Sequence, residues 1–175
     1  MVRGCRPKVL PIVPPKAAIP GRISRMDDID RKILAELQKN GRLSITEVAE
    51  RIGISLSPCH RRIRALEEDG VISGYRATIA PTAVGLTFSA IVFTTLREST
   101  HATLAAFEAA VLALPEVVSA ERLFGEPDYM LHIVTRDLAS FQQLYDRHLA
   151  SLPGVLKMTS TLVMKSLCQN RPLPL

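Results

Sequence analysis

The most constraining feature of this chain is a pair of short predicted helices separated by a glycine. Ser44 and Glu47 have the spacing of a capping box, in which each side chain bonds the other residue's backbone N–H. Gly53 can adopt the left-handed backbone of a tight turn. A second helix is predicted over 57–70, with Ser55 as its N-cap. Two helices joined in this way are typical of a helix-turn-helix.

The second of these helices has two different faces. Cys59, Ile63 and Leu66 recur at helical spacing and predict a buried stripe. Hydrogen-bond donors and cations occupy the other side: Ser57, His60, Arg61 and Arg64. Such a helix fits the major groove of double-stranded DNA, where arginine binds guanine edges or phosphates, and Arg62 on its flank is the better phosphate candidate. The alternative is a solvated surface helix.

The flanking residues extend this motif to a winged helix-turn-helix over 26–78. A third helix is predicted over 27–40, and Gly41 ends it. Its apolar stripe consists of Ile29, Ile33, Leu34 and Leu37. Residues 71–79 are rich in β-forming types and predict a wing strand.

The second half of the chain predicts a ferredoxin-like domain over 88–168, after a connector at 79–87 and before a tail at 169–175. The expected order β-α-β-β-α-β comes from six segments: strand 88–96, helix 100–114, strand 117–124, strand 129–136, helix 137–152 and strand 155–167. The fold class is therefore α+β. The strand at 88–96 is apolar on both faces, so a second copy of the chain or the wing domain should cover the face without helices.

Composition limits the alternatives. The chain has 175 residues, 47% of them hydrophobic, and no apolar run near 18 residues, so no membrane-spanning helix is expected. Its three cysteines lack metal-ligand spacing and are expected to be free thiols in a reducing cytoplasm. Residues 1–25 hold six of the 22 basic residues and no acid, so the net charge of +5 comes from this segment. We expect a disordered basic, proline-rich tail there; the alternative is an arm that contacts phosphates.

The chain resembles the Lrp/AsnC, or feast/famine, family of transcription regulators. In the first half the resemblance runs over residues 29–44, 53–59 and 61–75. In the second half it includes the turn Gly125-Glu-Pro-Asp-Tyr129 and the helix-to-strand break Leu152-Pro-Gly-Val155. It implies a DNA-binding domain joined to an effector domain that dimerises and binds a small ligand, commonly an amino acid. Dimers of this family often assemble further, frequently to octamers.

The resemblance also implies the effector site. Its expected residues are Gly125, Asp128, Leu138, Thr161, Leu162 and Val163. Asp128 would accept hydrogen bonds from the α-ammonium group of the effector. The alternative is an ordinary hairpin turn in which Asp128 bonds its own backbone. Glu126 and Pro127 depart from the residues usual in the family, so the resemblance leaves the identity of the effector open.

An enzyme is the competing hypothesis, because certain sirohaem decarboxylases resemble this family. The candidates for tetrapyrrole chemistry are His101, His132 and His148, but no nucleophile or acid stands at a diagnostic spacing from them. His132 alternates with apolar neighbours, which is more typical of a hydrogen-bonded interior histidine. We therefore expect no catalytic residues, no cofactor and no metal site, and interpret the chain as a DNA-binding regulator.

Overall fold

The computed structural model describes residues 26–175; the predicted basic tail, residues 1–25, lies outside the described residues. The chain divides into two compact units. The first contains the described residues up to Ala77 together with Cys168–Leu175, and the second contains Thr78–Leu167. In this described part, no helix is both long enough and apolar enough to cross a membrane.

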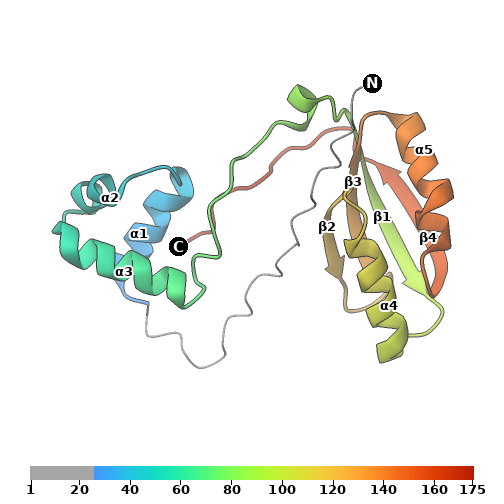
Figure 1. Ribbon diagram of the computed structural model, residues 1–175, viewed down its shortest axis with the longest axis horizontal. Helices are drawn as coiled ribbons and strands as arrows, with labels where there is room; N and C mark the ends of the chain where they lie inside the picture. The colour runs from blue at the N-terminus through green and yellow to red at the C-terminus, as the bar shows by residue number, and fades with distance from the viewer. Residues whose placement is uncertain (1–25) are drawn as a thin grey trace, which may run out of the picture. The chain divides into compact units, whose positions relative to one another are not determined.

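The three helices of the first unit form close to their predicted ranges. They are α1 (Asp28–Lys39), α2 (Ile45–Ile52) and α3 (Leu56–Glu68) (Figure 1). Ser44 and Glu47 form the predicted capping box of α2, with the Ser44 N–H donating to Glu47 Oε2 at 2.7 Å. Gly53 ends α2 with a φ of 74°, which is the left-handed backbone required for the turn into α3.

One face of each helix forms a small shared core. Its buried residues are Ile33, Leu34, Val48, Ala49, Cys59, Ile63 and Leu66. The predicted stripe of α3 is therefore confirmed. Burial raises the pKa of the Cys59 thiol, so this cysteine behaves as a small apolar side chain.

The predicted wing strand at 71–79 is wrong. The described chain has no strand there, and the segment is extended and largely exposed. A strand needs a neighbouring strand to complete its hydrogen bonds, and the first unit supplies helices instead. Tyr75 links the segment to α3, since its hydroxyl donates to Glu67 Oε1 at 3.0 Å. Burial, and then this bond, raise the pKa of Tyr75 to about 12.

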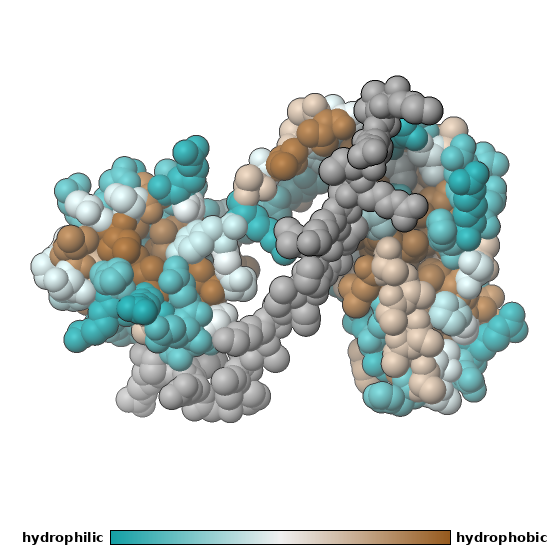
Figure 2. Space-filling view, viewed as in Figure 1, coloured by the Kyte–Doolittle hydropathy of each residue, from teal (hydrophilic) through white to brown (hydrophobic). Residues whose placement is uncertain are grey.

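The second unit confirms the predicted β-α-β-β-α-β order. Its elements are η1 (Pro81–Val84), β1 (Phe88–Leu96), α4 (His101–Leu112), β2 (Val117–Arg122), β3 (Tyr129–Thr135), α5 (Leu138–Arg147), η2 (Leu149–Ser151) and β4 (Val155–Leu162). The four strands form one antiparallel sheet in the order β2-β3-β1-β4. Around η1, Ile79 and Val84 leave a hydrophobic surface exposed (Figure 2).

The last strand ends earlier than its composition predicts. Ala90 pairs with Leu162, and one further bond joins the Val163 N–H to the Ser89 carbonyl. Because β1 begins at Phe88, β4 then has no partner, and the predicted extension to residue 167 does not form.

The two faces of the sheet differ. Both α4 and α5 lie on one face, as Figure 1 shows. On β1, Ala90, Val92 and Thr94 belong to the buried core on that side. Ile91 and Phe93 alternate with them, point to the opposite face and are only half-buried. The unit therefore has one covered apolar face and one that is still partly open.

Candidate DNA interface and effector turn

The exposed face of α3 carries most of the predicted DNA contacts. Ser57, His60 and Arg61 are exposed, and their side chains make no hydrogen bond or ion pair within residues 26–175. Opposite them, Cys59 and Ile63 lie in the core. The packing of Cys59 and Ile63 therefore determines which side of α3 is exposed to solvent. The hydrogen-bond donors on that side are available to a ligand.

Arg64 is also on this face, but it has a partner. Its Nε lies 3.2 Å from Glu68 Oε1, and both side chains are about 70% exposed. An ion pair so open to water contributes little to stability. Arg64 can therefore exchange Glu68 for a phosphate or a base at low cost.

The start of α3 adds a feature that the sequence did not predict. Ser55 is at the N-cap, but its side chain makes no capping hydrogen bond, contrary to expectation. The first turn also contains no acidic residue. The unpaired N–H groups and the positive end of the helix dipole are thus free to attract an anion such as a DNA phosphate.

Arg62, the expected phosphate contact on the flank of α3, makes two ion pairs inside its own domain. Its Nη1 lies 2.7 Å from Asp27 Oδ2 and 2.8 Å from Asp30 Oδ1, so one guanidinium joins α3 to the start of α1. The Asp30 N–H, followed by the Arg62 guanidinium, lowers the pKa of Asp27. The two carboxylates raise the pKa of Arg62. This geometry gives no support to Arg62 as a DNA contact.

The predicted effector turn lies at one end of the sheet. Gly125 has a φ of 127°, a backbone conformation that favours glycine. Asp128 is held by its neighbours: its N–H donates to the Thr94 carbonyl at 3.0 Å, and its Oδ2 accepts from the Leu96 N–H at 2.7 Å. The carboxylate thus bonds backbone, as the alternative predicts, although that of a neighbouring strand. Its Oδ1 has no donor within the described residues.

The remaining predicted effector residues lie elsewhere. In the sheet register, Thr161 is opposite Ile91, whereas Asp128 bonds Thr94. Three residues of strand separate the two points by about 10 Å. The other three also lie toward the far end: Leu138 follows β3, Leu162 is the last residue of β4, and Val163 follows it. A single chain therefore does not gather the predicted set into one site.

Comparison with known proteins decides the family. Two family models match: a winged helix-turn-helix DNA-binding domain over residues 26–73 and an Lrp/AsnC ligand binding domain over residues 89–173. A leucine-responsive regulatory protein of Rhizobium meliloti is 42% identical over 82% of this chain and 94% of its own length. The chain belongs to the Lrp/AsnC family.

Other members of the Lrp/AsnC family agree along nearly their whole length. The Bkd operon transcriptional regulator of Pseudomonas aeruginosa is 37% identical, covering 87% of this chain and all of that protein. A transcriptional regulator of Neisseria meningitidis, solved with L-Met, is 36% identical and has a TM-score of 0.80, covering 85% of this chain and 96% of that one. The chain is accordingly a DNA-binding transcriptional regulator with a ligand-binding domain.

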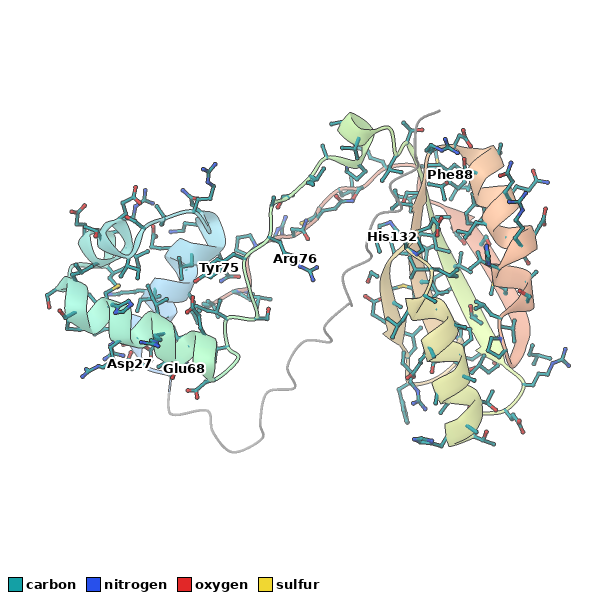
Figure 3. All side chains as sticks on the ribbon, in the orientation of Figure 1. Asp27, Glu68, Tyr75, Arg76, Phe88 and His132 are labelled. Atoms are coloured by element: carbon teal, nitrogen blue, oxygen red, sulfur yellow. The ribbon has the colours of Figure 1, made fainter. Side chains whose placement is uncertain are left out.

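The three histidines of the competing enzyme hypothesis lie on different elements of this Lrp/AsnC regulator. His101 begins α4, and His148 follows α5. His132 lies within β3, where its Nε2 is 2.7 Å from Ser89 Oγ (Figure 3). Among the described residues, no three His, Cys, Asp or Glu side chains are grouped to hold a metal ion.

The Arg62 ion pairs predict a pH-dependent contribution to stability. Because the folded state lowers the pKa of Asp27 from 3.8, the resulting stability is present above pH 3.8 and is lost as the pH falls through the lower folded value. Replacing Arg62 with glutamine should lower the thermal midpoint at pH 7. The difference from wild type should shrink at an acidic pH below the lowered pKa of Asp27, since this carboxylate is then protonated. Thermal melts followed by circular dichroism measure both values; an equal difference at both pH values would contradict this role.

Proposed function

We propose that this regulator binds its operator as a symmetric dimer and that an apolar amino acid alters its DNA binding. One α3 helix reads only a few base pairs. Two such helices related by a two-fold axis read a palindrome whose half-sites lie one helical turn, or a multiple of it, apart. A dimer is therefore the smallest assembly that gives useful specificity.

The partly open face of the sheet supports the dimer. Ile91 and Phe93 on β1 alternate with the buried core, and in the register Phe93 is opposite Met130 on β3. An apolar face of this kind is favourable to bury, and a two-fold axis lets one patch cover its own copy. We infer that two sheets pack face to face.

Exposed apolar side chains support the proposal for the effector site. Phe124 is fully exposed beside the turn, and at the other end of the sheet Leu138 and Leu162 are 58% and 55% exposed. Neighbouring chains would cover these side chains and could place the turn of one chain against Leu138 and Thr161–Val163 of another. Association of dimers, up to octamers, would complete such a site.

The chemistry of this shared site suits an α-amino acid with an apolar side chain. Asp128 Oδ1 can accept from the α-ammonium group, while Leu138 and Leu162 provide apolar surface. Two solved relatives, the N. meningitidis regulator and a feast or famine regulatory protein of M. tuberculosis, were crystallised with L-methionine. L-Methionine and L-leucine are therefore the first effectors to test. If the effector binds more tightly to one oligomeric assembly, it favours that assembly, and the affinity of the protein for DNA changes with it.

Asp128 variants test the effector site. At a concentration 100 times its dissociation constant, L-methionine should stabilise the wild-type protein by about 2.7 kcal/mol. Asp128→Ala should abolish this thermal shift and the effect on DNA binding, while DNA affinity without ligand stays near wild type. Asp128→Asn is the matched control for folding, because its side-chain oxygen can still accept from the Leu96 N–H. Asp128→Asn should also lose the response, since it lacks the charge; an unchanged affinity for L-methionine would exclude Asp128.

Mixed oligomers test whether two chains share the site. Asp128→Asn removes the carboxylate from the turn half of the proposed shared site, and Leu162→Asp places a charge in its apolar half. Neither variant alone should therefore respond to L-methionine. In co-expressed mixtures, about one quarter of shared sites combine two intact halves. The mixture should therefore regain part of the thermal shift. A mixture as unresponsive as either variant would place the whole site within one chain.

We also infer that the protein acts by binding, without catalysis. The Ser89–His132 pair has no carboxylate bonded to its imidazole, and the side chains of His101 and His148 bond neither an acid nor a nucleophile in the described chain. A tetrapyrrole absorption band in the purified protein would contradict this inference.

A further inference from the structure

A groove beside α5 has no part in DNA binding or in the proposed effector site. It runs along the helix, between α5 and the turn that precedes β2, and encloses about 390 Å³. Its residues come from four segments of the second unit and include none of the proposed effector residues. Hydrophilic residues cover the outer part of α5 that is visible in Figure 2.

Two arginines and a histidine without ion-pair partners in the described chain line this groove. Arg136 precedes α5, while Arg147 and His148 lie at its end. Within residues 26–175, none of these three side chains makes an ion pair. Asp137 is adjacent to Arg136, but its carboxylate accepts from the Ser140 N–H at 2.6 Å and caps α5. The groove therefore has two guanidinium groups available for an anion.

Neutral donors lie between the two arginines. Ser140, Gln143 and Arg147 are three, four and seven residues apart, which places them in one row along α5. A hydroxyl, an amide and a guanidinium thus face the groove in turn. Arg136 supplies the second cation near the first turn of α5, so the two positive groups lie toward opposite ends.

The floor of the groove between these ends has an apolar part, next to the buried Thr135. This part is formed by Leu86, Val134 and Leu144, of which Val134 and Leu144 are buried. Such a floor favours contact with hydrocarbon. A ligand that matches the groove therefore has an acidic group at each end and a short hydrocarbon spacer between them.

We propose that this groove binds a small dicarboxylate of four to six carbon atoms. Each carboxylate can receive a bidentate pair of hydrogen bonds from an arginine. Glu116 also lines the groove and repels every anion, so a compact phosphate has no electrostatic advantage there over a dicarboxylate. Phosphate also lacks the hydrocarbon that would contact the apolar floor.

Calorimetric titration of the full chain at constant ionic strength tests the proposal. The ligands are glutarate, valerate and inorganic phosphate; valerate has the same number of carbons as glutarate but one carboxylate. Glutarate should bind about ten-fold more tightly than valerate, because a second charge-assisted pair forms, and phosphate should bind more weakly than glutarate.

The variants assign the binding to the groove. Arg147→Gln and Arg136→Gln should each weaken glutarate binding about ten-fold, since each removes one pair. Gln143→Glu should weaken it through charge repulsion. The control is Arg97→Gln, which changes an exposed arginine outside the groove and should leave the affinity unchanged. Equal affinity for glutarate and valerate, phosphate binding as tight as glutarate, unchanged binding by Arg147→Gln, or no millimolar binding by wild type would each overturn the proposal.

Discussion

Replacing Arg61 with alanine should weaken operator binding by about 1–3 kcal/mol for each α3 helix that reads a base. Arg61 is the exposed arginine of α3 whose guanidinium has no partner within the described chain. A symmetric dimer carries the substitution in both half-sites, and distant sites add, so the dimer should lose about 2–6 kcal/mol. Fluorescence anisotropy with an operator duplex at fixed salt measures the loss.

Binding to unrelated DNA separates two kinds of interaction. If Arg61 reads a base, the loss should be confined to the operator. If it binds a phosphate, all sequences should weaken alike, and the slope of the salt dependence should fall by about one for each phosphate that is no longer bound. Arg31→Ala, on the exposed surface of α1, is the matched control and should bind normally. Normal affinity of a folded Arg61→Ala, Arg64→Ala double variant would exclude this face of α3.

Replacing Ile91 with aspartate should convert the proposed dimer into monomers. Ile91 is half-buried on the open face of β1, directly opposite His132 of β3. In a face-to-face dimer, the new carboxylate would be removed from water within an apolar interface, which costs several kcal/mol for each chain. Sedimentation velocity at micromolar concentration measures the change in mass. Operator binding should weaken as well, because the two α3 helices are then no longer held together.

Leu112→Asp is the matched control for this change. Leu112 is an apolar residue of α4, 57% exposed, on the helical side of the domain. The same new charge there should leave the dimer intact. A folded Ile91→Asp protein that remains dimeric at micromolar concentration would show that the open face is not the dimer interface.

The sequence by itself determined the elements and their order. Ser44 and Glu47, which are three residues apart, predicted the capping box and the start of α2. Cys59, Ile63 and Leu66 predicted the buried side of α3, and with it the exposed side. The strand over 88–96 formed with the predicted bounds. These features succeeded because they depend on interactions within a few residues along the chain or on a simple period of hydrophobicity.

The candidate DNA interface was predictable for the same reason, apart from two residues. Ser57, His60, Arg61 and Arg64 lie on the exposed face because the helical period puts them opposite the core. Arg62 lies at the edge of that face, and the helical periodicity of the sequence does not indicate which carboxylates it bonds. The sequence also did not predict that the Ser55 side chain makes no capping hydrogen bond. A serine at the N-cap position can form this bond but does not have to.

The tertiary structure decided what depends on residues far apart in the chain. Arg62 bonds Asp27, which lies 35 positions away in the chain. Residues 71–79 could form a strand only if another strand lay beside them. The effector residues implied by family resemblance separated because the register of β1 with β3 and β4 places Asp128 and Thr161 at different points along the sheet. The periodicity of hydrophobic residues indicates which side of a helix or strand is buried. Which other element packs against that side depends on pairing between distant parts of the chain, and interactions between neighbouring residues do not determine that pairing.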